Sequence, residues 1–325
     1  MVKIQTNKDR YRNLCVERQD IPLFIQSWWM DAVCNNKNWD VLIFERSNKI
    51  LGVLVYYFIK RLGFKIIIQP QLTQFNGIWL DYSNKNIGTN FISFEKEVTT
   101  DLIKQLEELK FCYYDQNFHY SFTNWLPYYW KGYEQTTRYT YQILDISDTD
   151  KCYSQFKGSK KSHINKAKKN IQINFELSGE EFYRHLTQNL KVIGHKVHYT
   201  KDLFMRIYDV CKLRNQGCII SAYDNDMNLH AALFLVWDNH SAYNLISTIN
   251  PEYRSSGATS LLFYEAINKM STKSKIFDFE GSMTENIEKS FSEFGSVQIP
   301  YFRIRKYNSI SFKILFHSMK WIRSK

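Results

Sequence analysis

Short apolar runs, separated by turn-forming residues, make up most of the first half of the chain. Residues 39–46 and 50–60 alternate or run apolar around Ser47-Asn48-Lys49, which predicts a β-hairpin. A third predicted strand, residues 64–69, ends at Pro70, because proline has no N–H to donate to a sheet. The other elements expected here are helices at 22–35 and 87–110 and strands at 112–119 and 136–145.

The second half shows a similar succession of helices, antiparallel strands, a further helix and closing strands. Residues 218–223 and 229–237 flank Asp224-Asn-Asp-Met-Asn228, a turn-favouring stretch, so a second hairpin is expected. A strand at 242–249 ends at Asn250-Pro251 and precedes a helix at 258–270. The remaining predicted elements are helices at 149–158, 159–170, 180–191, 201–215, 285–294 and 309–323, and strands at 172–177, 275–279 and 298–305.

The repeated order of elements suggests an internal structural duplication, although the two halves share negligible residue similarity. A chain of 325 residues can hold two domains, at about 100–200 residues each. Polar residues replace an aromatic strand near 145–150, so we expect domains at 1–147 and 148–325. The expected fold class is mixed α/β, with two tandem domains that each hold a mostly antiparallel sheet flanked by helices.

Composition and charge narrow the classes of partner. Lys and Arg number 43 against 32 Asp and Glu, and the net charge of +11 favours phosphate-bearing cofactors, nucleotide sugars, RNA or an acidic membrane surface. The six cysteines lack paired metal-ligand spacing, which indicates reduced thiols and no metal site. No apolar stretch resembles a signal peptide or approaches the ~20 residues that span a bilayer, so we expect a cytoplasmic protein.

The segment 249–267 carries the most informative pattern. A buried strand ends at Asn250, a polar turn follows, and an apolar helix begins. The first N–H groups of a helix are unpaired and its dipole favours an anion, so the turn is a candidate cradle for a pyrophosphate. An ordinary glycine-containing helix start would have the same pattern. The candidate residues are Arg254, Ser255, Ser256, Gly257, Ala258 and Thr259.

Two carboxylates lie close together in Phe277-Asp-Phe-Glu-Gly281. On a strand, Asp278 and Glu280 would point to the same side, since side chains alternate. Placing two such carboxylates on one face costs free energy unless they bind a ligand or take part in catalysis. Their mutual repulsion raises the pKa of one of them. We predict that Glu280 acts as a general base and that Asp278 either anchors the neighbouring backbone or holds the substrate that accepts the transferred group. The alternative is that both carboxylates lie on a solvent-facing strand edge and have no role in chemistry.

A lysine-rich helix and an early loop contain further residues that could bind a substrate. Lys157, Lys160 and Lys161 lie on one side of the helix predicted within 156–169, where they would attract an anionic substrate or form a solvated basic surface. Gln74 and Asn76 lie in the polar loop after the third strand, and such loops are where open α/β sheets place their ligands.

The last predicted helix is basic and amphipathic, and it would either pack on its domain or contact an anionic membrane reversibly. Its apolar residues Phe312, Leu315, Phe316 and Ile322 interleave with the cations Lys313, Lys320 and Arg323.

Arg254-Ser-Ser-Gly257-Ala-Thr259 resembles the cofactor-binding turn of the GNAT N-acyltransferase superfamily, whose pattern is Arg/Gln-x-x-Gly-x-Gly/Ala. Thr259 stands where that pattern has a small residue. The run from Phe277 to Gly281, followed by a helix ending in Phe294-Gly295, is similar to the Fem-type, acetyltransferase-like branch of the superfamily. Ile164-Asn-Lys166-Ala167 fits the basic helix that opens the second half of those proteins, where Lys161-Ser-His163 replaces the usual arginine.

The resemblance implies an N-acyltransferase that moves an acyl group from acyl-CoA, such as acetyl-CoA, to an amine. The acceptor would be a small molecule, an amino sugar or a lipid-linked cell-envelope precursor, bound on the side of a degenerate first domain. The loop at residues 70–78 resembles one that these proteins carry after an early strand, so Gln74 and Asn76 are the candidate acceptor contacts. Within the same fold, the alternative is a Fem-type enzyme that uses aminoacyl-tRNA and acts on a peptidoglycan precursor. An alternative from another class is a non-catalytic, basic nucleic-acid-binding module. The acyl group, the acceptor and the oligomeric state stay open.

Overall fold

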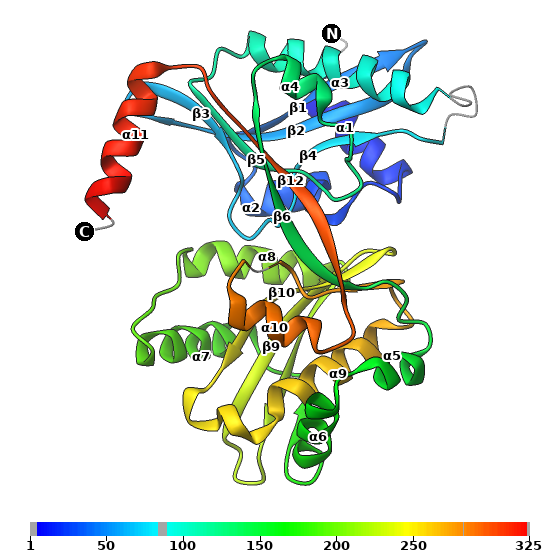
Figure 1. Ribbon diagram of the computed structural model, residues 1–325, viewed down its shortest axis with the longest axis vertical. Coiled ribbons are helices and arrows are strands. Elements are labelled where there is room, and N and C mark those ends of the chain that lie inside the picture. The colour runs from blue at the N-terminus through cyan, green and yellow to red at the C-terminus, as the bar shows by residue number, and fades with distance from the viewer. Residues whose placement is uncertain (1–4, 84–89, 282, 324–325) are drawn as a thin grey trace. The chain divides into compact units, whose positions relative to one another are not determined.

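The computed structural model describes residues 5–83, 90–281 and 283–323, with side chains of the last helix described through Phe316 and at Ser318. It divides into two compact units (Figure 1). The first comprises Met1–Arg138 and Pro300–Lys325, and the second comprises Tyr139–Ile299. These bounds differ from the predicted 1–147 and 148–325, because residues 139–147 belong with the second unit and residues 300–325 with the first.

The first unit contains helices on a sheet of mostly antiparallel strands. Its elements are α1 (Asn7–Glu17), η1 (Leu23–Ile25), α2 (Ser27–Val33), β1 (Trp39–Arg46), β2 (Lys49–Arg61), β3 (Phe64–Ile68), β4 (Gly77–Leu80), α3 (Phe91–Glu108), β5 (Tyr113–Asn117), α4 (Leu126–Trp130), the start of β6 (Glu134–Ile143), most of β12 (Val297–Tyr307) and α11 (Ile310–Arg323). The strand order is β1–β2–β3–β5–β12, and β4 pairs with the first part of β2. Among these pairs, only β3 and β5 are parallel.

The apolar periodicity of α3 produces the core of this unit. Val98, Leu102, Ile103 and Leu106 recur at three- and four-residue spacing, so they lie on one helix face, and all are fully buried against the sheet. The β1–β2 turn contains Ser47 and Asn48 at φ +51° and +62°. Successive left-handed residues suit a two-residue hairpin turn, which confirms the predicted hairpin.

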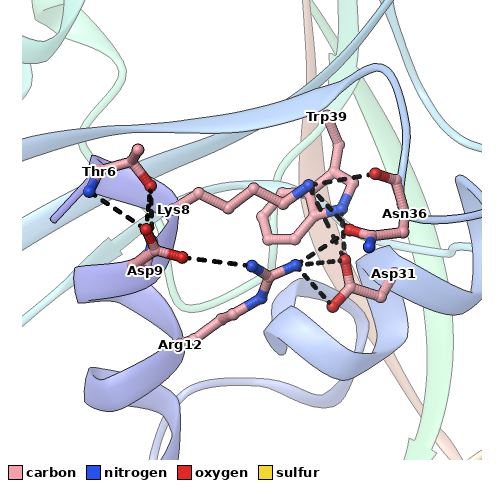
Figure 2. Close-up of polar contacts among 7 residues, drawn as sticks. All are labelled: Thr6, Lys8, Asp9, Arg12, Asp31, Asn36 and Trp39. Atoms are coloured by element: carbon pink, nitrogen blue, oxygen red, sulfur yellow. Dashed lines mark hydrogen bonds and ion pairs between the residues drawn. The ribbon is translucent and has the colours of Figure 1, made fainter. Parts of the chain in front are cut away.

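A polar network connects α1 to the rest of the first unit (Figure 2). Asp31 accepts hydrogen bonds from the guanidinium of Arg12 at 3.0 Å and from the indole N–H of Trp39 at 2.9 Å. The Lys8 ammonium lies 4.1 Å from the centre of the Trp39 ring, a cation–π contact. Helix α1 buries only Tyr11 fully, and these polar contacts link it to Asp31 of α2 and Trp39 of β1.

The second unit has the sheet order β6–β11–β10–β9–β8–β7. Its elements after β6 are α5 (Thr149–Gln155), α6 (Gly158–Ala167), β7 (Gln172–Asn174), α7 (Gly179–Val192), α8 (Lys201–Leu213), β8 (Gly217–Tyr223), β9 (Leu229–Trp237), β10 (Ser241–Ile249), η3 (Pro251–Ser256), α9 (Ala258–Met270), β11 (Ile276–Asp278), α10 (Glu285–Ser292) and the start of β12. Only β10 and β11 pair in parallel among the described pairs of this unit.

Alternating side chains of this sheet pack against helices on its two faces. On β9, Leu233 and Leu235 join a core cluster with Leu262 and Ala266 of α9. Phe234, between them in the sequence, points to the other face and contacts Phe182 of α7 and Phe204 of α8. Figure 1 shows α9 and α7–α8 on opposite sides of the strands. The predicted fold class, mixed α/β with mostly antiparallel sheets, is confirmed.

Several local predictions differ from the structure. Strand β4 and helix α4 were not predicted, because β4 has only four residues after a polar loop and α4 only five, with a proline among them. The helix expected at 87–110 is α3, and residues 84–89 lie outside the described part of the chain. The predicted strand 275–279 is shorter, since β11 ends at Asp278.

The C-terminal helix packs through its first turns on the first unit. Phe312 is buried beside Ile66 and Tyr113, and Phe316 lies 5.4 Å from the Tyr113 ring. Ile310 and Ile314 are exposed. The side chains of Lys320, Ile322 and Arg323 lie outside those that the structure describes.

Candidate functional site

The candidate site lies in the second unit, where the parallel strands β10 and β11 stop pairing. Their register runs from Ser241–Ile276 to Tyr243–Asp278, after which β11 ends while β10 continues to Ile249. An irregularity in the β9–β10 register between Asn244 and Ile246 bends β10 at the same level. The backbone of β10 beyond Tyr243 therefore has no strand partner on the β11 side among the described pairs.

The turn predicted to hold an anion follows β10 directly. Pro251–Ser256 form the 3-10 helix η3, Gly257 adopts φ +83°, and α9 begins at Ala258. The Ser256 hydroxyl accepts a hydrogen bond from the Ala258 N–H at 3.2 Å, which satisfies one of the free donors of the helix start. The next N–H groups, of Thr259 and Ser260, have no acceptor earlier in the helix. The start of α9 can therefore donate hydrogen bonds to an anion.

A pocket of about 220 Å³ opens at this helix start. It collects residues from α6, the end of β10, the turn, the start of α9 and α10. Its lining residues are Lys160, His163, Ile249, Arg254, Ser255, Gly257, Thr259, Ser260, Ser290 and Phe294. The structure thus brings Lys160 together with four of the six turn residues predicted from the sequence. The pocket is smaller than the ~300–1,000 Å³ of typical ligand sites, so it would hold one part of a ligand, such as a phosphate group.

The fold itself requires a glycine at position 257. A Cβ at this position would lie 2.4 Å from the carbonyl oxygen of His163, and the left-handed φ disfavours any side chain. A bulky residue here would therefore disturb the fold itself, because the backbone of α6 lies directly against the turn. Lys166 reinforces this contact by donating to the Ser255 carbonyl at 2.8 Å, while Ile164 and Ala167 of the same motif are buried in the core.

The three candidate lysines of α6 have different surroundings. Lys157 pairs with Glu293 at 2.9 Å, and Lys161 donates to the Ser154 carbonyl at 2.7 Å beneath the Tyr153 ring. Lys160 is 8% exposed, lines the pocket and donates to the Ser290 hydroxyl at 3.0 Å. The three side chains therefore do not form one open basic surface, and only Lys160 reaches the pocket.

Asp278 is fully buried and acts as a structural anchor. Its carboxylate accepts hydrogen bonds from the Thr140 hydroxyl at 2.5 Å and the Gln142 amide at 2.8 Å, both on β6. It also accepts the Glu280 N–H at 2.7 Å. Three donors to one carboxylate favour its ionised form and tie β6, β11 and the following loop together. Thr140 and Gln142 were not predicted, although their alternation along a strand marks a polar face.

Glu280 lies just beyond β11, with its backbone at φ +58°. The alternation argument therefore does not apply to it, and the predicted placement of both carboxylates on one strand is corrected. A left-handed non-glycine residue is strained, and such strain concentrates at functional sites. Gly281 lies close to β6, since a Cβ there would be 2.0 Å from the Tyr139 carbonyl oxygen, so the loop is pressed against β6.

The Glu280 side chain has an unusual environment. Its Oε1 atom is buried and has no hydrogen-bond partner among the described residues. Burial raises the pKa of Glu280 well above its usual value, and the neighbouring Asp278 charge raises it further. The two carboxylates thus differ, because Asp278 accepts three hydrogen bonds and Glu280 has a buried oxygen without a partner among the described residues.

Gln74 and Asn76 belong to the first unit and are both buried. The side-chain carbonyl oxygen of Asn76 accepts the Gly77 N–H at 2.8 Å, and its amide contacts the sulfur of Met30 at 3.8 Å. The buried Asn76 side chain therefore stabilises the conformation of this loop. Gln74, 9% exposed, keeps its predicted role of acceptor contact as an untested prediction.

Two observations on residues 5–83, 90–281 and 283–323 concern metals and membranes. No group of three or more His, Cys, Asp or Glu side chains in these ranges is arranged to hold a metal ion. Within the same ranges, no helix has the length and apolarity needed to cross a bilayer.

Comparisons with known proteins agree with this geometry. Residues 155–282 match the family described as "Acetyltransferase (GNAT) domain". No curated protein matches significantly. The FemX crystal structure aligns with a TM-score of 0.68 at 12% identity, covering 93% of this chain and 97% of FemX.

Two further structures share the fold. The C-terminal domain of a putative lysylphosphatidylglycerol synthetase from Agrobacterium fabrum has a TM-score of 0.58 at 8% identity, with 96% of each chain covered. A tandem GNAT protein from the clavulanic acid biosynthesis pathway has a TM-score of 0.54 at 7% identity, with 91% of this chain and 92% of that one covered. Residues 155–282 thus match a GNAT acetyltransferase domain, and the chain as a whole shares its fold with FemX.

Proposed function

We propose that the protein is an N-acyltransferase that moves an acyl group from acyl-CoA to an amine on a small molecule, an amino sugar or a cell-envelope precursor. The observation that carries this proposal is the pocket in which the start of α9, Arg254 and Lys160 come together. Arg254 is exposed and has no ion-pair partner among the described residues, so its guanidinium can bind a phosphate. The match of residues 155–282 to a GNAT acetyltransferase domain agrees with an acyl-CoA donor.

In the proposed reaction, the acceptor amine attacks the thioester carbonyl carbon. The new C–N bond forms as the C–S bond breaks, and coenzyme A leaves as its thiolate. Glu280, in its ionised form, would take the proton released by the amine. Asp278 would hold the loop that carries Glu280 by accepting its N–H. The raised pKa of Glu280 makes its carboxylate a stronger base once it is deprotonated.

A second donor, aminoacyl-tRNA, is supported by the net charge of +11 and by the fold shared with FemX. A lipid acceptor is suggested by the name of the lysylphosphatidylglycerol synthetase neighbour. Both donors occur in the cytoplasm, which is where we place the reaction. The non-catalytic nucleic-acid-binding alternative is not retained, since residues 155–282 match an acetyltransferase domain.

Calorimetric titration of the purified chain tests the proposal. We expect acetyl-CoA to bind, and Arg254→Ala to weaken that binding through loss of a charge-assisted contact, by roughly 10-fold or more. Turnover would be followed as thiol release in the presence of a panel of amines. Binding of aminoacyl-tRNA without binding of acetyl-CoA would favour the second donor. Binding of neither would contradict the proposal.

A further inference from the structure

Lys160 is a buried cation on the wall of the donor pocket. It is 8% exposed, although lysine is among the residues least often buried. Its ammonium lies 4.7 Å from the centre of the Phe294 ring, and the side chain lines the same pocket as Arg254 and Gly257. Helix α6, which carries Lys160, crosses the turn at His163, so it brings a positive charge to a pocket otherwise built from the turn, β10, α9 and α10.

The partners of Lys160 within the protein compensate its charge only in part. The ammonium donates one hydrogen bond, to Ser290, and its distance to the Glu293 carboxylate is 3.7 Å. Glu293 is shared with Lys157, which lies closer at 2.9 Å. Burial lowers the pKa of Lys160, and this effect exceeds the opposing attraction of Glu293. An ammonium group has three N–H donors, so capacity remains for an anion in the pocket.

We propose that Lys160 binds a phosphate group of the donor and makes the pocket selective for donors that carry one. This inference rests on the proposed function, and it assigns Lys160 to the donor, where the sequence pattern indicated only an anionic substrate. The phosphate lies between the Lys160 ammonium and the first N–H groups of α9. Lys157 and Lys161 take no part, because their side chains do not line the pocket and contact Glu293 and Ser154 instead.

The test compares Lys160→Met with Lys161→Met as a matched control on the same helix. Methionine keeps an unbranched apolar stem beside Phe294 and removes only the charge. Two probes are titrated by calorimetry: coenzyme A, which carries phosphates, and pantetheine, which carries none. We expect Lys160→Met to weaken coenzyme A binding by roughly 10- to 100-fold and to leave pantetheine binding unchanged. Lys161→Met should leave both affinities at the wild-type value.

Two further variants separate charge from folding. Lys160→Arg keeps the positive charge and should retain more coenzyme A affinity than Lys160→Met. Lys160→Gln supplies a second neutral variant if methionine disturbs the pocket, and the thermal midpoint of each variant reports on folding.

The outcomes separate the two proposals. Wild-type protein that binds coenzyme A, with an equal affinity in Lys160→Met and Lys160→Gln, overturns the role of Lys160 and leaves the proposed function standing. An equal loss for coenzyme A and pantetheine would also overturn it, since the effect would then not depend on phosphate. Wild-type protein that binds no coenzyme A overturns the proposed donor and this inference with it.

Discussion

The main-chain N–H of Glu280 donates a hydrogen bond of 2.7 Å to the carboxylate of Asp278. This bond holds Glu280 in a left-handed backbone conformation just past the end of β11, with one carboxyl oxygen buried and without a partner among the described residues. One carboxylate therefore positions the other, and the two side chains should respond differently to substitution.

Replacing Glu280 by Gln should lower turnover by roughly 10²–10⁴-fold, the usual contribution of a positioned base. In the wild type, activity should rise with pH as Glu280 loses its proton, because the raised pKa keeps it protonated at lower pH. The variant should lack this rise. Rates measured from pH 6 to 9 with a good amine acceptor check both points. Near-normal turnover of the variant over that range would remove Glu280 from the chemistry.

The same variant should gain stability relative to the wild type as the pH increases. The folded-state pKa of Glu280 is raised, so its stabilising effect is present below the unfolded value of about 4.3 and is lost as the pH rises through the folded value. The glutamine side chain of the variant does not titrate. Between the unfolded-state and folded-state pKa values, the unfolding free energy of the variant should rise relative to that of the wild type by up to about 1.4 kcal/mol per pH unit. Urea unfolding at several pH values measures it, and a constant difference would contradict the burial of an ionisable group here.

Asp278→Ala should destabilise the second unit. The substitution leaves the Thr140 hydroxyl, the Gln142 amide and the Glu280 N–H without their buried acceptor. At about 1–3 kcal/mol for each unsatisfied group, we expect a loss of about 3 kcal/mol or more in unfolding free energy. Asp209→Ala, at an exposed position of α8, is the control and should change stability by less than about 0.7 kcal/mol. Equal effects in the two variants would mean that Asp278 is not an anchor.

Gly257→Ala should cost more stability than Gly194→Ala. Both glycines have positive φ, at +83° and +75°, so each substitution carries the left-handed penalty of about 1–2 kcal/mol. Only at Gly257 does the added Cβ meet a neighbour, the His163 carbonyl oxygen at 2.4 Å, whereas nothing lies within 4 Å at Gly194. Thermal unfolding of both variants gives the comparison. If the two midpoints fall equally, α6 does not constrain the turn.

The sequence by itself determined the succession of elements and the turn. The alternation in residues 39–60 and the helical spacing of Leu102, Ile103 and Leu106 predict a hairpin and a core helix because these patterns depend on residues near one another in the chain. The polar turn from Arg254 to Thr259 was found in the same way, since a strand end, a glycine and a helix start are local features.

Only the tertiary structure decided the roles of individual side chains. Lys157, Lys160 and Lys161 are equivalent in the sequence, and they differ because Glu293 and Ser290, more than a hundred residues away, reach two of them. Asp278 and Glu280 looked like a matched pair, but β6 supplies donors to Asp278 only. Burial and charge compensation depend on groups brought together from distant segments, and a one-dimensional pattern does not contain those contacts.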